Sequence, residues 1–284
     1  MLKDKFKDRR ADNAFFSADI HKTAIIHPSV HIGTGSVVGP YTYIGPGVKI
    51  GINNVIERHV DIAGGTTIGD NNRIYSNAAI GGDPQDRTYQ AEHTELIIGD
   101  NNIIREFVTI SRGTVKGGGV TRIGDHNMFM AYAHIAHDCS IGNYTTLVNS
   151  ANLAGHVHVE DRAFIGGLVA IHQHVVVGTM AIVGLNTCVS MDVPPFTMAA
   201  GNRAALRGIN VIGLKRNGFS EKSISRLKKS YPILFREHSH LQDRIEKLEA
   251  LDLYHDEVRV LTEFIKSSKR GYLRHYKRDI NAPC

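Results

Sequence analysis

Residues 20–80 divide into hexads without a remainder: IHKTAI, IHPSVH, IGTGSV, VGPYTY, IGPGVK, IGINNV, IERHVD, IAGGTT, IGDNNR and IYSNAA, closed by Ile80. An aliphatic anchor opens every hexad. The spacing resumes at Ile98 and runs again from Ile123 to Val189. Two residues before the anchors stand small or β-branched residues or asparagine, with Leu96 the only larger one. An α-helix repeats every 3.6 residues and a simple strand every two, so neither produces this period.

A period of six predicts short strands separated by sharp corners, with each anchor pointing inward. Three such strands close a coil of about 18 residues, and successive coils stack at about 4.8 Å, the usual strand spacing. We therefore expect an all-β parallel β-helix of roughly nine coils over residues 18–200.

Composition limits the class of protein. The chain has 284 residues, and its aromatic content of 7% means that Ile, Val, Ala and Thr must build the core. No stretch approaches the ~18 uninterrupted apolar residues of a membrane helix. Eight of the first twelve residues are charged, which excludes a secretory signal and marks residues 1–17 as a charged N-terminal extension. Three widely spaced cysteines form no disulfide framework, so we expect a cytoplasmic protein without an integral membrane segment.

The C-terminal part differs from the repeat region in both charge and pattern. From Arg203 onward there are 18 Lys and Arg against 10 Asp and Glu, whereas the rest of the chain has a small negative balance. Apolar residues at helical spacing follow Ser220, a candidate N-cap, and Pro232 should kink or end that helix. We expect a smaller α-helical domain over residues 201–284. The positive charge fits an acidic partner, although a solvated helical surface explains it more simply; we expect no nucleic-acid partner.

Two interruptions break the repeat. Residues 81–89, GGDPQDRTY, are polar and lack anchors, and residues 112–119, RGTVKGGG, form a second excursion. Long loops that break a regular solenoid tend to carry function.

Seven of the 16 histidines lie between His126 and His174. The period of 18 aligns His137, Gly155 and Gln173 in one column on successive coils. Asp138, His156 and His174 form the next column, with His172 beside it. A base, a carboxylate that orients it and a free backbone donor are the parts of an acyl-transfer site. The columns therefore predict an active site.

Zinc is the main competitor, because some hexapeptide β-helices are zinc carbonic anhydrases. Those enzymes place two histidines five residues apart. Here Gly142 follows His137 at that distance and Val177 follows His172. We expect no metal.

Several strings resemble one enzyme family, the acyl-carrier-protein–UDP-N-acetylglucosamine O-acyltransferases of lipid A biosynthesis. They are ISRGT (110–114) with GGG (117–119), AHIAHDC (133–139), LAGHV (153–157), HQ (172–173), DVPP (192–195), GN (201–202) and GLKRNGFS (213–220). The resemblance covers roughly residues 18–270.

The resemblance implies a left-handed β-helix, a homotrimer with active sites between subunits, and transfer of an (R)-3-hydroxyacyl group from acyl carrier protein to the sugar 3-hydroxyl. It implies that His137 is the general base, that Asp138 orients it and that the Gly155 N–H stabilises the oxyanion. Substrate binding is implied for Gln85, Asp86, Arg87, His134, His156, His172, Gln173, Arg203, Asn210 and Arg216. The carrier thioester is a co-substrate and no cofactor is expected, while the basic helices would dock the acidic carrier protein.

Two positions depart from the family. Where its members usually have Gln-Asp-x-Lys, this chain has Arg87 and Thr88 as the last two residues, which leaves open an acceptor with a 3-amino group. Arg87, one residue earlier, is the alternative substitute for the lysine. At the position whose side chain sets the acyl-chain length in the family, the chain has Leu185, and a side chain of this size predicts a shorter acyl chain. Leu185 lies 48 residues after His137, on a different face, so it meets that site only across a subunit boundary. A packing role for Leu185 and a coenzyme A–dependent acetyltransferase remain the alternatives.

Overall fold

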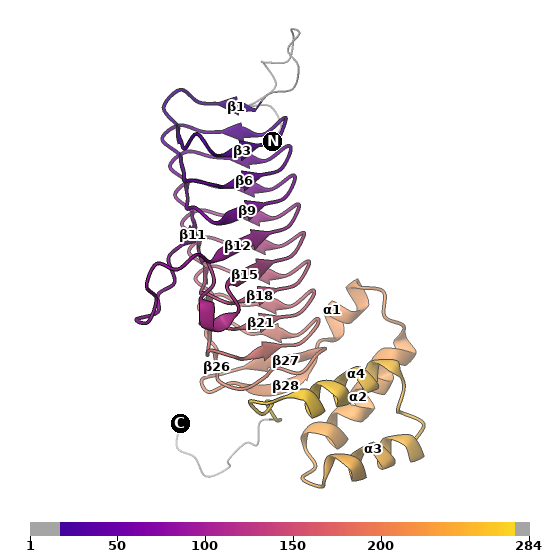
Figure 1. Cartoon of the computed structure of the whole chain (residues 1–284). Coiled ribbons are helices and arrows are strands. Elements are labelled where there is room, and N and C mark those ends of the chain that lie inside the picture. The colour runs from indigo at the N-terminus through magenta and orange to yellow at the C-terminus, as the bar shows by residue number, and fades with distance from the viewer. Residues whose placement is uncertain (1–17, 276–284) are drawn as a thin grey trace.

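The computed structural model describes residues 18–275. The charged extension expected over residues 1–17 therefore lies outside the described residues. From Asp19 to Val189 the chain winds as a left-handed parallel β-helix of triangular coils, and four helices lie beside its C-terminal end (Figure 1). The predicted fold class is confirmed. No helix within residues 18–275 combines the length and the apolar character needed to span a membrane.

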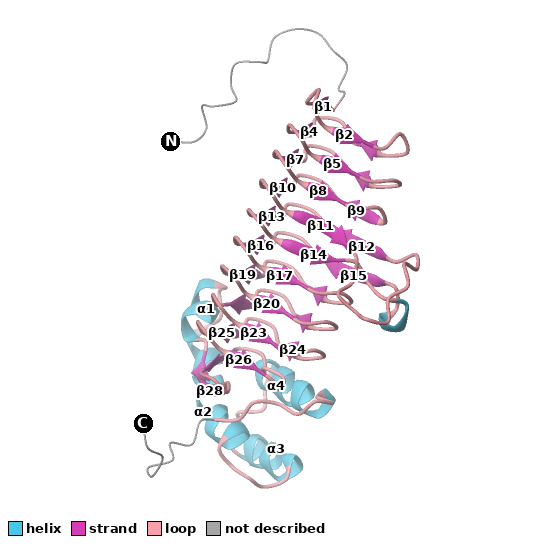
Figure 2. Cartoon of the chain, turned by 90° about the vertical axis from the view of Figure 1, so that its left-hand side faces the viewer, coloured by secondary structure: helices cyan, strands magenta, loops and turns pink. Residues whose placement is uncertain are grey.

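The strands form three faces (Figure 2). The first face contains β1 (Asp19–Ile20), β4 (Val37–Val38), β7 (Val55–Ile56), β10 (Arg73–Ile74), β13 (Ile103–Ile104), β16 (Met128–Phe129), β19 (Thr146–Leu147), β22 (Phe164–Ile165), β25 (Ile182–Val183), β27 (Thr197–Ala200) and β28 (Ala205–Ile209). The second contains β2 (Ile25–Ile26), β5 (Tyr43–Ile44), β8 (Asp61–Ile62), β11 (Ala79–Gly82), β14 (Thr109–Ser111), β17 (His134–Ile135), β20 (Asn152–Leu153), β23 (Ala170–Ile171) and β26 (Cys188–Val189). The third contains β3 (His31–Ile32), β6 (Lys49–Ile50), β9 (Thr66–Ile68), β12 (Glu95–Ile98), β15 (Val120–Ile123), β18 (Ser140–Ile141), β21 (His158–Val159) and β24 (Val176–Val177).

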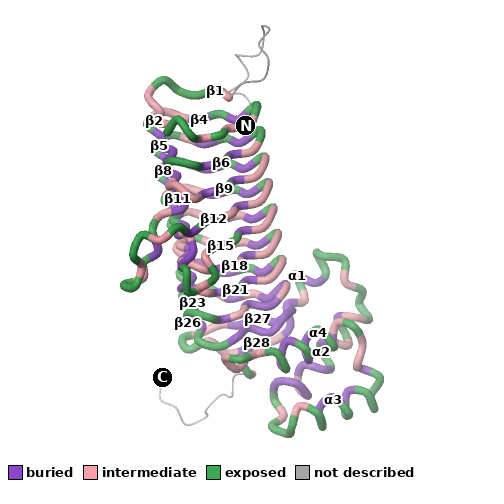
Figure 3. Tube along the Cα trace, in the orientation of Figure 1, coloured by how far each residue is buried: buried purple, intermediate pink, exposed green. Residues whose placement is uncertain are grey.

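In most strands of the β-helix the anchor is buried and the residue before it is more exposed, so the anchor faces inward and its neighbour outward (Figure 3). Ile44, Ile62 and Ile74 are fully buried, whereas Ile20 on the first coil is 45% exposed because no coil among residues 18–275 covers it. The interior residue two places before the anchor stacks along the axis as well. The Asn54 side chain accepts from the Asn72 N–H at 2.9 Å, and the Asn72 side chain accepts from the Asn102 N–H at 2.8 Å. The small or polar residues of the hexad therefore satisfy backbone donors inside the coil.

The interruptions of the repeat are insertions at corners. Ile68 pairs with Ile98, and Ile98 with Ile123, whereas a coil without an insertion, such as that from Ile50 to Ile68, advances by 18 residues. The first insertion leaves the coil after β11, and the second contains a short 3₁₀ helix, η1 (Val115–Gly117). The two loops project from the same side of the β-helix (Figure 1). They contact each other, because Arg112 in the second loop donates to Asp83 and to the Tyr89 hydroxyl in the first.

The chain adds strands after the anchors end. β27 follows Pro194-Pro195, pairs in parallel with β25, and turns back through the antiparallel strand β28. The helices are α1 (Val211–Arg216), α2 (Glu221–Phe235), α3 (Leu241–Ala250) and α4 (Asp256–Ser267). Ser220 caps α2 as predicted, while Pro232 lies within its last turn and the helix continues to Phe235. The short helix α1 was not predicted. The division at residue 200 stays a prediction.

The inward anchors should account for most of the stability of a coil. Ile50 is 4% exposed and Lys49, beside it on β6, points outward. We expect Ile50→Ala to lower the free energy of unfolding by about 2–5 kcal/mol, because it removes buried methyl groups and leaves a cavity. Lys49→Ala should change it by less than about 0.5 kcal/mol. Urea unfolding followed by circular dichroism measures both, and equal effects would contradict the inward–outward assignment.

Candidate active site

His137 lies in the corner between the second and third faces, directly after β17. Strand register aligns Ile135 with Leu153 and Leu153 with Ile171, which places His137, Gly155 and Gln173 on successive coils as the period predicts. The imidazole lies against the backbone of Gly155. A Cβ added at Gly155 would be 2.6 Å from His137 Cε1, so only glycine leaves room for the ring.

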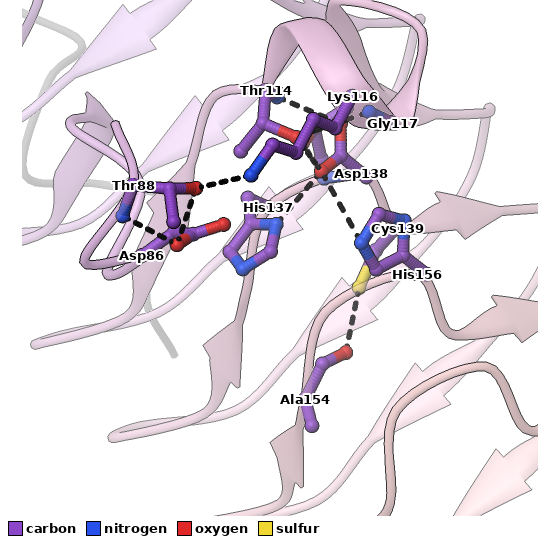
Figure 4. A network of polar contacts seen from close by, with 11 residues as sticks. Asp86, Thr88, Thr114, Lys116, Gly117, His137, Asp138, Cys139, Ala154 and His156 are labelled. Carbon is purple, nitrogen blue, oxygen red and sulfur yellow. Dashed lines mark hydrogen bonds and ion pairs between the residues drawn. The ribbon is translucent and has the colours of Figure 1, made fainter. Parts of the chain in front are cut away.

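Asp138 is the centre of a hydrogen-bond network (Figure 4). Its Oδ1 accepts from the Thr114 N–H, and its Oδ2 accepts from the Thr114 hydroxyl, both at 2.7 Å. His137 Nδ1 lies 2.7 Å from the same Oδ2. The Asp138 side chain is 1% exposed, and Gly117 is packed so closely against it that a Cβ there would overlap the carboxylate. The second loop therefore holds this carboxylate in place.

These contacts determine the tautomer of His137. A carboxylate only accepts hydrogen bonds, so the neutral ring carries its proton on Nδ1 and donates it to Asp138. The lone pair is then on Nε2. With its side chain 14% exposed, the ring can meet a ligand from outside. A histidine oriented by a carboxylate in this way is a suitable general base.

Gly155 supplies a backbone donor at the same place. Its residue is buried, and within residues 18–275 its N–H has no hydrogen-bond acceptor. A buried amide donor without a partner is unfavourable in an unliganded protein. The donor is therefore available to a negatively charged oxygen that forms next to His137.

The second column extends the site along the β-helix. Asp138, His156 and His174 have positive φ angles near 60° at equivalent corners. His156 Nε2 lies 3.7 Å from Asp138 Oδ2, and its ring stacks on His174 with centroids 4.4 Å apart. Burial lowers the pKa of His156 from its usual value, although the charge of Asp138 acts in the opposite direction. His156 is therefore a neutral hydrogen-bonding group at neutral pH.

His134 is neutral for a similar reason. It is half-buried, and its Nδ1 lies 2.7 Å from the Thr109 hydroxyl. Burial, and then the charge of His137, lower the pKa of His134. Cys139, next to Asp138 in sequence, is 1% exposed, and burial raises the pKa of its thiol to about 12. That thiol stays protonated and is no nucleophile.

The first loop contributes Asp86. Its Oδ1 accepts from the N–H of Thr88 at 2.8 Å and from its hydroxyl at 2.9 Å. These hydrogen bonds lower the pKa of Asp86, and the charges of His137 and Lys116 lower it further. Asp86 therefore lies within electrostatic range of His137. Gln85 and Arg87 are exposed on the same loop.

Within residues 18–275, no hydrogen bond, ion pair or ring contact joins His172, Gln173, Arg203 or Asn210 to His137. His172 bonds to Arg270 at 2.8 Å, and it lines, with Arg203, a cavity of about 530 Å³. Gln173 is exposed. Asn210 is buried as the N-cap of α1: its side chain accepts from the Gly213 N–H and donates to the Met180 carbonyl. Its contact with a substrate stays a prediction.

Two further residues lie on other parts of the chain. Arg216 is exposed at the end of α1. Leu185 is 72% exposed in the corner between β25 and β26, which is a different corner from that of His137. Neither residue is part of the His137 network within one chain.

His137, Asp138 and His156 also offer three ligand atoms within 4.8 Å of one another, as a metal site requires. Asp138, however, already accepts three hydrogen bonds, one of them from His137 Nδ1. About one of its four acceptor sites is then left for an ion. The expectation of no metal stays a prediction.

Comparisons with known proteins all match the same group of acyltransferases. Residues 192–273 match the family model described as UDP N-acetylglucosamine O-acyltransferase, domain 2, and residues 121–155 match that of the bacterial transferase hexapeptide repeats. The chain is 51% identical to the acyl-[acyl-carrier-protein]–UDP-N-acetylglucosamine O-acyltransferase of Alkalilimnicola ehrlichii, over 90% of this chain and 99% of that one. The protein of the same name from Thermodesulfovibrio yellowstonii is 52% identical over the same shares. This chain belongs to the UDP-N-acetylglucosamine O-acyltransferase family.

Solved structures of the family have the same architecture. LpxA of Acinetobacter baumannii is 39% identical with a TM-score of 0.86, covering 90% of this chain and 99% of that one. UDP-N-acetylglucosamine acyltransferase of Campylobacter jejuni is 40% identical with a TM-score of 0.85, covering 91% and 100%. The resemblance found in the sequence is confirmed, and with it the assignment of an acyltransferase.

Sequence reasoning missed the residues that support the His137–Asp138 pair. Thr114 and Gly117 hold Asp138, and the Thr121 hydroxyl accepts from its backbone N–H at 2.8 Å. The second loop was identified as functional, but no single residue in it was. The nearest signal was its glycine run, because close packing against a carboxylate requires a residue without a Cβ.

Gly155 offers a test of the site that does not alter any titrating group. We expect Gly155→Ala to lower kcat by at least about 100-fold, since the new methyl group displaces the His137 ring from its position beside the backbone donor. Gly82 has no atom within 4 Å of an added Cβ and serves as the control, because Gly82→Ala meets no steric conflict. Steady-state acyl-transfer rates measure both effects. Equal rates in the two variants would contradict the close contact between the Gly155 backbone and the His137 ring.

Proposed function

We propose that the protein transfers an (R)-3-hydroxyacyl group from acyl carrier protein to the 3-hydroxyl of UDP-N-acetylglucosamine, the first step of lipid A biosynthesis. The observation that carries the proposal is the His137–Asp138 pair placed directly over the backbone of Gly155. Family membership supplies the substrate class, since the relatives are named for this acceptor and this donor.

In the proposed reaction, His137 Nε2 takes the proton of the sugar 3-hydroxyl while the oxygen attacks the thioester carbonyl. Asp138 holds the ring and stabilises the imidazolium that forms. The carbonyl oxygen becomes an anion, which the Gly155 N–H stabilises. Collapse of the tetrahedral intermediate breaks the carbon–sulfur bond, and the departing carrier thiol takes the proton back from His137. The proposed steps use no redox cofactor, because they involve no net oxidation or reduction.

The remaining polar residues would bind the sugar nucleotide. We assign this role to His134, His156, His172 and Gln173 along the β-helix, and to Gln85, Asp86 and Arg87 on the first loop. Arg203, Asn210 and Arg216 would bind its uridine and phosphate part, which carries the negative charge. The neutral state of His134 and His156 supports this role, since neutral imidazoles both donate and accept.

We propose that the active protein is a homotrimer. Outward residues of the first face are largely apolar: Val37, Val55, Ile103 and Phe164 are between 36% and 42% exposed, and Arg73 and Thr146 interrupt them. Exposed apolar surface of this kind favours a subunit contact. A trimer would also bring Leu185 of one subunit to His137 of the next, where it limits the acyl chain.

The acidic carrier protein would dock on the basic C-terminal region. Residues 203–284 carry 18 Lys and Arg against 10 Asp and Glu, which favours association with an acidic partner. We place the reaction in the cytoplasm. The two cysteines among the described residues are both free thiols, as in a reducing compartment.

An acyl-transfer assay read by mass spectrometry tests the proposed function. We expect an ester product from a medium-length (R)-3-hydroxyacyl carrier protein and UDP-N-acetylglucosamine, and a loss of about 100- to 10,000-fold in His137→Ala with the oligomer intact. His158→Ala, at an exposed position of β21, should retain the wild-type rate. If only the 3-amino analogue were acylated, to an amide, the acceptor would have to be reassigned. If acetyl-CoA were turned over without carrier protein, the donor would have to be reassigned.

The acyl-length assignment has its own test. We expect Leu185→Gly to shift the preferred donor to a longer chain, because removing the side chain frees space and each additional buried CH₂ contributes about 0.8 kcal/mol. Leu251→Gly is the control, since Leu251 is 54% exposed after α3. Competition among carrier proteins of increasing acyl length gives the profile. An unchanged profile in Leu185→Gly would assign Leu185 to packing alone.

A further inference from the structure

A lysine from the second loop reaches the position at which the first loop departs from its family. Lys116 Nζ donates to the Thr88 hydroxyl at 3.0 Å, and that hydroxyl donates to Asp86 Oδ1 at 2.9 Å (Figure 4). Thr88 stands where the family pattern has lysine. The contact between the two loops therefore places the Lys116 ammonium group next to Thr88, the position at which the family pattern has a lysine.

The same turn connects Lys116 to the catalytic pair. Thr114 caps η1, the 3₁₀ helix that contains Lys116, and bonds to Asp138 through both its N–H and its hydroxyl. Asp86 has electrostatic interactions with both Lys116 and His137. Lys116 is thus held on one side by the turn that fixes Asp138 and on the other by the loop that carries Asp86.

The ammonium group retains capacity for a ligand. A lysine has three N–H donors, and the contact with Thr88 uses one of them. Lys116 is exposed, and within residues 18–275 no carboxylate lies at ion-pair distance from it. Arg112 on the same loop differs, because its guanidinium is paired with Asp83. Of the two cations of the second loop, Lys116 is therefore the one with donors left for an incoming oxygen, while Arg87 is a second exposed cation, on the first loop.

We propose that Lys116 binds the acceptor sugar next to His137 and selects a 3-hydroxyl over a 3-amino group. This inference rests on the proposed function. A hydroxyl oxygen offers lone pairs to an ammonium donor, whereas an amino group in its charged form offers none and is repelled. Lys116 therefore replaces, from a different loop, the cation absent at position 88, and the acceptor keeps its hydroxyl.

Three variants and two acceptors test the assignment by steady-state kinetics, with acyl carrier protein as donor. We expect Lys116→Gln to lower kcat/KM for UDP-N-acetylglucosamine by roughly 10- to 100-fold, the usual range for a lost charged hydrogen bond. The 3-amino analogue should lose less, so the preference for hydroxyl falls. Thr88→Lys combined with Lys116→Gln should restore both rate and preference, because it returns an ammonium to the same place. Lys49→Gln, which removes an exposed charge from β6, should behave as wild type.

The outcomes separate this assignment from the proposed function. A wild type that acylates neither acceptor overturns the proposed function, and this assignment with it. An active wild type with an unchanged preference in Lys116→Gln overturns the assignment alone. Equal losses for both acceptors without rescue by Thr88→Lys also overturn it, since they show that Lys116 only joins the two loops.

Discussion

The return of the chain to the same place after each coil is the constraint on which the structure depends. Successive coils are one strand spacing apart, about 4.8 Å, so every side chain has a neighbour of equivalent position above and below. At each interior position, side chains of similar size and polarity therefore stack from coil to coil, as the isoleucines and the Asn54–Asn72–Asn102 ladder do. Additional chain can leave only at a corner, and both insertions do so.

Asp138 and His156 lie at ordinary corners of the β-helix, with the same backbone conformation as other corner residues. Asp138 and His156 have the positive φ that Tyr41, His59 and Arg162 adopt at other corners, and residues at such corners stack on one another elsewhere, as His126 does on Tyr144. What distinguishes the site is the insertion. Thr114 and Gly117 belong to the second loop, and their contacts turn an ordinary corner residue into a fixed carboxylate.

Features that follow from the repeat were predictable from the sequence, and those that depend on the insertions were not. A period of 18 was enough to align His137 with Gly155 and Asp138 with His156. It carried no information about where a loop outside the repeat folds back, so the bonds from Thr114 to Asp138 and from Lys116 to Thr88 had no sequence signal. Helix α1 was missed because it has only six residues and depends on the Asn210 cap. Strand β27 was missed because it pairs beyond the last anchor, after two prolines.

The proposed function also needs a place for the acyl chain. The His137 ring is accessible from the corner, with its side chain 14% exposed, and the groups that contact it in Figure 4 are polar. An acyl chain left in water would lose about 0.8 kcal/mol for each CH₂ that remains exposed. The apolar residues that could enclose it, Phe164 and Leu185, are exposed at or beside the first face. The proposed trimer resolves both facts together: it buries the apolar face, and it brings a second wall to the corner where the base and the backbone donor meet.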